Sequence, residues 1–188
     1  IPAAKSLLGS GQSARSPGAV EIAAAARYAG QLADVVLALA PVLRERLQLV
    51  GKCGIKLVAP ARPEHRIKHY DSSAAHIAAS VEASLRALRT DRLDLLLIHR
   101  PDPLLDADEV ARAFESLRAA GKVRHFGVSN FAPAQFELLA SRFPLVTNQI
   151  ELHPLQRAAL TDGTLDQMQR LRIRPMVWSP LAGGALIS

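Results

Sequence analysis

The sequence is short of several residue types, and each shortage disfavours a class of protein. Cys53 is the only cysteine in 188 residues, which excludes an internal disulfide framework. Aromatic residues make up 4%, and the arginines are scattered along the chain instead of forming a patch with interleaved aromatics, which disfavours nucleic-acid binding. No apolar run approaches membrane-span length, and no signal-peptide pattern opens the chain. We therefore expect a cytoplasmic protein that has neither a nucleic-acid nor a membrane partner.

What the sequence does contain is a strongly apolar segment at 93–98, Leu-Asp-Leu-Leu-Leu-Ile, followed by His99 and Pro101. An apolar run of this length is typical of a strand buried on both faces of a parallel sheet. His99 stands at the C-terminal end of that strand. In barrels of alternating strands and helices, this end of each strand carries the chemistry.

Four further apolar runs also end at polar or charged groups. They are 47–50 before Gly51-Lys52, 123–128 before Ser129-Asn130, 145–150 before Glu151, and 175–178 before Ser179. The intervals between them can each hold a helix, which predicts a parallel α/β fold with right-handed crossovers. A complete eightfold barrel needs about 250 residues, so the chain is short for that architecture.

Cap residues and apolar spacing predict the helices. Residues 19–40 read as one or two helices, and Pro41 begins a short one. Ser72-Ser73 precedes the stripe Ile77, Val81, Leu85 and Leu88; Asp106 precedes Val110, Ala113, Phe114 and Leu117, with Gly121 after them; Pro133 precedes Phe136 and Leu139; Gly163 precedes Leu165, Met168 and Leu171.

Taken one at a time, the polar groups at the strand ends have ordinary explanations. Lys52 fits a partly exposed lysine, and His99 fits a hydrogen-bonded core histidine. The pair Ser129-Asn130 fits a helix cap, and Trp178 fits simple packing. The spacing of His65 and His69 suits a metal, but no third ligand is near, which favours a solvated face. The predicted position of the strand-end groups at one edge of one sheet is what favours a functional site.

Five segments resemble the aldo-keto reductases, in particular their bacterial YdhF-like branch. They are Gly-Lys-Cys-Gly at 51–54, Leu-Asp-Leu-Leu-Leu-Ile-His-Arg-Pro-Asp at 93–102, Gly-Lys-Val-Arg-His-Phe-Gly-Val-Ser-Asn-Phe at 121–131, Thr-Asn-Gln-Ile-Glu at 147–151, and Trp-Ser-Pro-Leu at 178–181. The resemblance covers 41–188 well and is faint before residue 41. It implies one incomplete TIM-barrel domain over 1–188, with about five clear strands and no eighth strand, and an NADPH-dependent carbonyl reductase that acts on a small-molecule substrate.

The resemblance also implies roles for individual residues. His99 would orient the carbonyl oxygen, Lys52 would lower the pKa of a proton-donating tyrosine, and Tyr28 is the best candidate for that tyrosine. The residues implied to bind the cofactor are Ser129, Asn130 and Gln149 at the nicotinamide carboxamide, Trp178 on the nicotinamide ring, and Ser179, Leu181 and Gly183 near the pyrophosphate.

Two departures from the family pattern leave other interpretations open. Ala23 stands where the pattern has an aspartate five residues before the tyrosine, and nothing after Ser188 can supply the basic loop that holds the adenosine phosphate. The chain could therefore be a degenerate, non-catalytic scaffold that binds a partner. It could equally be a segment of a longer reductase, and the sequence leaves both possibilities open.

Overall fold

The computed structural model describes residues 48–58 and 66–186. Several predictions lie outside these residues and concern the helices at 19–40 and from Pro41, the catalytic candidate Tyr28, Ala23, and His65.

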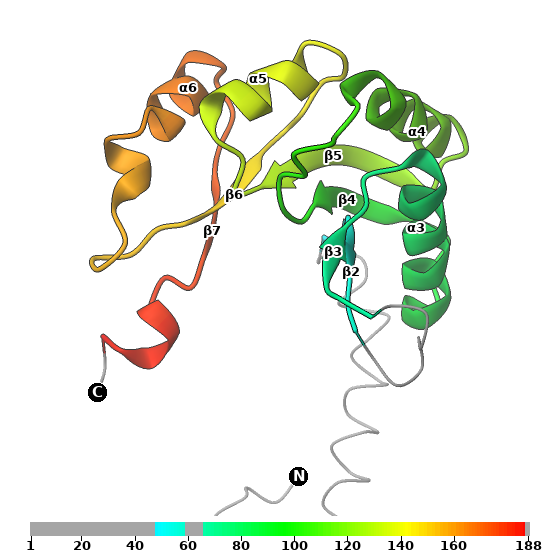
Figure 1. Cartoon of the computed structure of the whole chain (residues 1–188), viewed down its shortest axis with the longest axis horizontal. Helices are drawn as coiled ribbons and strands as arrows, with labels where there is room; N and C mark the ends of the chain where they lie inside the picture. The colour runs from blue at the N-terminus through cyan, green and yellow to red at the C-terminus, as the bar shows by residue number, and fades with distance from the viewer. Residues whose placement is uncertain (1–47, 59–65, 187–188) are drawn as a thin grey trace, which may run out of the picture. The chain divides into compact units, whose positions relative to one another are not determined.

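Except for a short antiparallel pair of strands directly after the first strand, strands and helices alternate along the described chain, as the sequence predicted (Figure 1). The strands are β1 (Val50–Cys53), β2 (Ile55–Lys56), β3 (His69–Tyr70), β4 (Leu93–Ile98), β5 (Val123–Ser129), β6 (Asn148–Glu151) and β7 (Met176–Trp178). The helices are α3 (Ala74–Leu88), α4 (Ala107–Ala119), α5 (Pro133–Ala140) and α6 (Thr164–Arg170), with short 3-10 turns η3 (Ala158–Leu160) and η4 (Ala182–Gly184). None of the described helices is long and apolar enough to cross a membrane.

Five strands form one parallel sheet in the order β1-β4-β5-β6-β7. The sheet is curled, and the chain segments that connect neighbouring strands all cross the same face of it (Figure 1). This is the predicted fold class, an incomplete barrel of the TIM type. Strands β2 and β3 form a separate antiparallel pair directly after β1.

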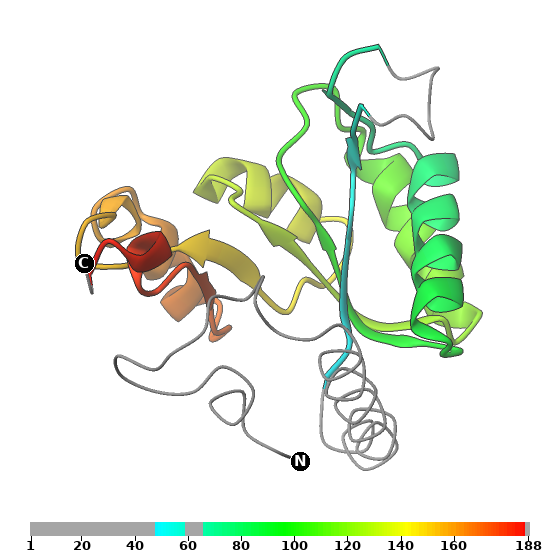
Figure 2. The ribbon, with the colours of Figure 1, turned by 90° about the horizontal axis from the view of Figure 1, so that it is seen from below.

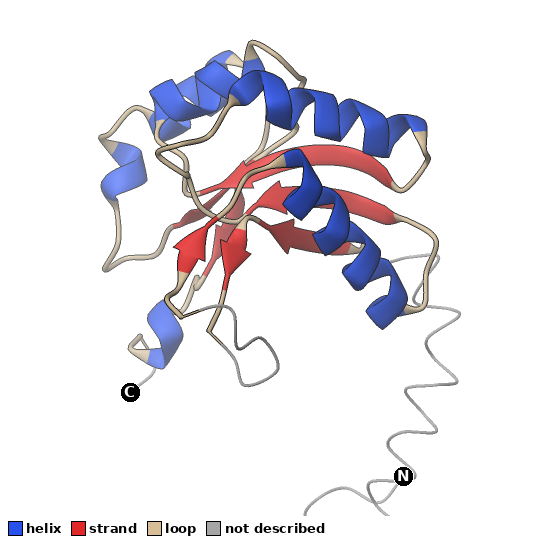
Figure 3. Ribbon diagram, turned by 45° about the vertical axis from the view of Figure 1, so that its right-hand side comes forward, coloured by secondary structure: helices blue, strands red, loops and turns tan. Residues whose placement is uncertain are grey.

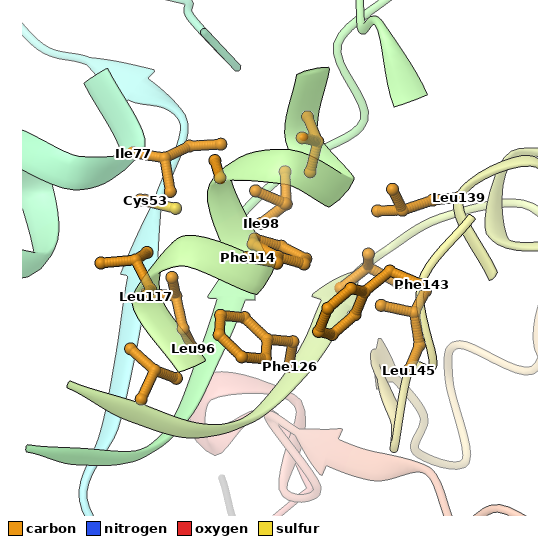
Figure 4. Close-up of a cluster of buried hydrophobic side chains, with 14 of the residues drawn as sticks. Cys53, Ile77, Leu96, Ile98, Phe114, Leu117, Phe126, Leu139, Phe143 and Leu145 are labelled. Atoms are coloured by element: carbon orange, nitrogen blue, oxygen red, sulfur yellow. The ribbon is translucent and has the colours of Figure 1, made fainter. Parts of the chain in front are cut away.

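The helices cover one face of the sheet, and the main core lies between them and the strands (Figure 3). The helix α3 packs beside β1, and α4 packs on β5 (Figure 2). Three rings form the centre of this core: Phe114 of α4 stacks on Phe126 of β5 at 4.4 Å between ring centroids, and Phe143 meets both rings edge-on (Figure 4). Stacked and edge-on aromatic pairs of this kind stabilise a core beyond the area they bury.

The predicted caps begin the helices. The Ser73 hydroxyl accepts a hydrogen bond from the His76 amide, and the Asp106 carboxylate accepts from the amides of Asp108 and Glu109. The side chain of Glu109 does not close a capping box on its own helix. It accepts from the Ala74 amide at 2.7 Å, so that a residue of α4 stabilises the first turn of α3.

Two predicted members of apolar stripes are more exposed than expected. Leu88 in the last turn of α3 is 44% exposed, and Leu171 just after α6 is 39% exposed. Both stand where their helix ends and the chain turns, so that the helix no longer faces the sheet there.

Two predicted strands have different bounds. Regular pairing of β1 starts at Val50 opposite Leu95 and continues to Cys53 opposite Ile98. Lys52 therefore lies within this strand, whereas the prediction placed it just after a strand at 47–50. The other strand, predicted at 145–150, begins only at Asn148. Its preceding segment bonds to β5 outside the regular ladder, through the Val146 amide to the Phe126 carbonyl. Backbone pairing with the neighbouring strand, more than local hydrophobicity, decided both bounds.

Candidate active site

The strand register places the predicted site residues on one face of the sheet. Lys52 is paired with Leu97, which precedes His99 by two residues, and Ser129 is paired with Gln149. Trp178 is paired with Glu151, two residues beyond Gln149. Because paired residues and residues two apart share a face, all these side chains lie opposite the helix-covered face, at the C-terminal ends of the strands. That is the position of the catalytic groups in barrels of this type.

Ser129, Asn130 and Trp178 form a hydrogen-bonded chain. The Asn130 amide nitrogen donates to the Ser129 hydroxyl at 2.8 Å, and that hydroxyl donates to the Gln149 carbonyl at 3.1 Å. The indole Nε1 of Trp178 donates to Asn130 Oδ1 at 3.1 Å. The orientation of the Trp178 ring is therefore set by Asn130, which is itself held by Ser129.

The turn that carries Asn130 is held by Asn148, a residue that the sequence did not single out. Asn130 has φ 58°, in the left-handed region that asparagine tolerates better than most residues. The buried Asn148 side chain accepts from the Phe131 amide at 3.3 Å and donates to the Phe131 carbonyl at 2.8 Å. The sequence signal that could have identified Asn148 was its place in the Thr-Asn-Gln motif, next to the predicted site residue Gln149 but on the helix-covered face. Ser129 and Asn130 do not cap α5, whose N-cap is Ala132.

Gln149 carries an unusual atom. Among the described residues, its Oε1 is the one buried side-chain oxygen or nitrogen without a hydrogen-bond partner. A buried acceptor that lacks a donor costs about 1–3 kcal/mol. An amide or hydroxyl donor from a bound molecule would satisfy it, so this position suits the carboxamide group that the sequence interpretation places here.

His99 and Lys52 stand together at the ends of β4 and β1. Burial lowers the pKa of His99, and the positive charges of Lys52, Arg100 and Lys68 lower it further. The imidazole is therefore neutral at pH 7, with one ring nitrogen protonated and able to donate a hydrogen bond. Lys52 is exposed, as in the ordinary explanation of this residue.

A cavity of about 650 Å³ opens beside these two residues, between the strand ends and α3. Its lining includes Lys52, Lys56, Lys68, His99 and Arg100. The guanidinium of Arg100 also lies over the Trp178 ring, 5.7 Å from its centroid. Arg100 was not predicted as a site residue, because nothing local in the sequence reports a contact across 78 positions.

The segment after β7 holds the remaining predicted cofactor residues. Ser179 has φ 52°, and Gly183 has φ 64° within the 3-10 turn η4. Leu181 is 55% exposed, and a Cβ added at Gly183 would meet open space. The loop therefore offers exposed backbone at the same edge of the sheet.

Within the part of the chain that the structure describes, no group of three or more histidine, cysteine, aspartate or glutamate side chains could hold a metal ion.

A curled parallel sheet with polar residues from four adjacent strand ends gathered on its inner face defines a TIM-barrel protein. The aldo/keto reductase family profile matches residues 22–188, and the chain belongs to this family.

Individual relatives agree with this assignment. The chain is 61% identical over 154 residues to oxidoreductase YdhF of Escherichia coli, covering 81% of this chain and 51% of that protein. It is 50% identical over 167 residues to a 6-dehydroglucose reductase of Agrobacterium fabrum, covering 86% and 56%. Among solved structures, a glycerol dehydrogenase from Gluconobacter oxydans matches with TM-score 0.67 and 33% identity, over 74% of this chain and 42% of that one. The chain thus spans about half the length of the curated relatives.

Proposed function

We propose that the chain forms part of an NADPH-dependent reductase of aldehydes or ketones. The observation that carries the proposal is the set of Gln149, Trp178 and the Ser129-Asn130 pair on one face, with Gln149 Oε1 buried and lacking a donor. The name of the Agrobacterium relative, 6-dehydroglucose reductase, agrees with a carbonyl substrate.

The residues present fit a nicotinamide. Gln149 Oε1 would accept from the carboxamide, the Trp178 ring would offer an apolar face, and the loop with Ser179, Leu181 and Gly183 would lie near the pyrophosphate. Asn130 acts here mainly by holding Ser129 and Trp178 in place, because both its polar side-chain atoms are already bonded to these two residues. The reduced nicotinamide, when bound, supplies a hydride.

The chain's own residues would prepare the carbonyl group for reduction. Neutral His99 donates a hydrogen bond to the carbonyl oxygen and so stabilises the charge that develops there. The ammonium of Lys52 lowers the pKa of a nearby tyrosine, so that its phenol gives up a proton more easily. Tyr28 is our candidate for that phenol.

A titration of the full chain with NADPH tests the proposal. Trp178 is the only tryptophan, so saturable quenching of its fluorescence reports binding next to it. Gln149→Ala should weaken binding about fivefold, the value of one neutral hydrogen bond, whereas Gln169→Ala on the exposed side of α6 should not. Calorimetry of Trp178→Ala gives a second probe, and NADH in place of NADPH tests cofactor choice.

Turnover is tested separately, as aldehyde-dependent loss of NADPH absorbance. Binding without turnover of any carbonyl compound would favour the non-catalytic scaffold, which the alanine at position 23 also favours. If a folded sample binds neither NADPH nor NADH, the reductase proposal is wrong.

A further inference from the structure

The cavity beside His99 is strongly cationic. Three lysines and one arginine line it, and it has a volume of about 650 Å³. Of these, Lys56 is paired with Asp71 at 2.5 Å. Within the described residues, Lys52, Lys68 and Arg100 form no ion pair. Three positive charges therefore face one cavity with no carboxylate of the described chain bound to them.

Two acidic side chains close to the strand ends, Asp102 and Glu151, have other partners. Asp102 accepts from the Ser72 hydroxyl at 2.9 Å and from the Leu104 amide at 2.9 Å. Glu151 lies 3.3 Å from the His153 ring nitrogen. Like charges without partners at one site repel each other, which costs free energy. A ligand of opposite charge offsets this cost when it binds, so such a cluster of cations indicates an anion-binding site.

Arg100 connects this charge to the reaction centre. It follows His99 directly in the sequence, and its guanidinium lies over one face of the Trp178 ring, the side chain on which the nicotinamide is proposed to stack. No described residue accepts a hydrogen bond from the Arg100 guanidinium, and its N–H donors match two oxygens of a carboxylate or a phosphate.

We propose that Arg100 is a specificity residue that binds an oxyanion on the substrate, so that the preferred substrates are carbonyl compounds carrying a carboxylate or phosphate group. Lys68 and Lys52 add to the positive potential of the cavity and attract such substrates. This inference names the substrate class of the proposed reductase and rests on that function.

Binding alone is tested first, because it does not depend on turnover. Calorimetry at low ionic strength should show that succinate binds the full chain at least tenfold more tightly than it binds Arg100→Gln. Arg86→Gln, which removes an exposed arginine from α3, should leave the affinity unchanged, and neutral succinamide should bind at least tenfold more weakly than succinate. Equal affinity in wild type and Arg100→Gln, equal affinity for succinamide, or no succinate binding to the folded chain would overturn the proposal.

Kinetics with matched substrates then separate the two proposals and the two anions. We expect kcat/KM to favour succinic semialdehyde over butanal, or glyceraldehyde 3-phosphate over glyceraldehyde, at least tenfold, with the preference lost in Arg100→Gln. The pair that shows the preference identifies the oxyanion. Turnover of the neutral aldehydes as fast as the charged ones would refute the role of Arg100 and leave the reductase proposal intact. Arg100-dependent succinate binding with no turnover of any aldehyde would support the anion site at Arg100 and refute the reductase proposal.

Discussion

At the scale of single residues, the site depends on a side chain that touches no ligand in the proposed function. Asn148 is buried and bonds both the amide and the carbonyl of Phe131, which fixes the turn that presents Asn130. We expect Asn148→Ala to lower the free energy of unfolding by about 2–4 kcal/mol, because it removes two bonds and leaves buried backbone groups unsatisfied. Denaturant unfolding followed by circular dichroism measures the change.

Gln135→Ala is the matched control for this prediction. Its side chain also bonds backbone at the same turn, accepting from the Ala132 amide at 3.0 Å, but it is exposed. Water can replace that bond, so the loss should stay below about 1 kcal/mol. Equal losses in the two variants would show that burial of the Asn148 amide is not what stabilises the turn.

At the scale of elements, the sequence predicted well whatever local chemistry determines. Caps at Ser73 and Asp106 and the apolar run of β4 were sufficient to place α3, α4 and β4. It placed β1 and β6 less well, because their bounds follow from pairing with a neighbour. The contact of Arg100 with Trp178 could not be predicted, since it exists only after the sheet has curled.

The strand β1 offers a test through its single thiol. Burial raises the pKa of Cys53 to about 12, and the thiol lies against the Leu97 carbonyl on β4. At pH 8 the reactive thiolate is then only about 1 part in 10⁴ of the folded chain. Labelling by a thiol reagent should therefore require β1 to open, and its rate should be orders of magnitude below that of the chain in denaturant.

The same pKa shift has a consequence for stability. Between the ordinary thiol pKa, about 8.5, and about 12, the unfolded chain has lost a proton that the folded chain keeps, so stability should fall as the pH rises through this range. Cys53→Ala should remove this part of the alkaline loss while costing some packing. For the labelling experiment described above, rapid modification of Cys53 in the native protein at pH 8 would contradict the buried, paired position of β1.

At the scale of the whole molecule, the arrangement of the sheet sets the behaviour in solution. Within the described residues, β1 and β7 are each paired on one side only, whereas a closed barrel of this family type has eight strands and no free edge. Val177 in the middle of β7 is 43% exposed, so this strand presents an apolar side chain beside its unpaired edge. Edges of this kind recruit strands from other chains.

We therefore expect the 188-residue chain to self-associate at micromolar concentration, measured by sedimentation velocity over a concentration series. Val177→Lys places a charge on the edge and should shift the equilibrium toward monomer, because association would bring like charges together. Leu104→Lys, at a 90% exposed position in the loop before α4, is the matched control and should leave association unchanged. A monodisperse monomer at every concentration, or an equal effect of both lysines, would mean that the β7 edge is covered within the chain itself.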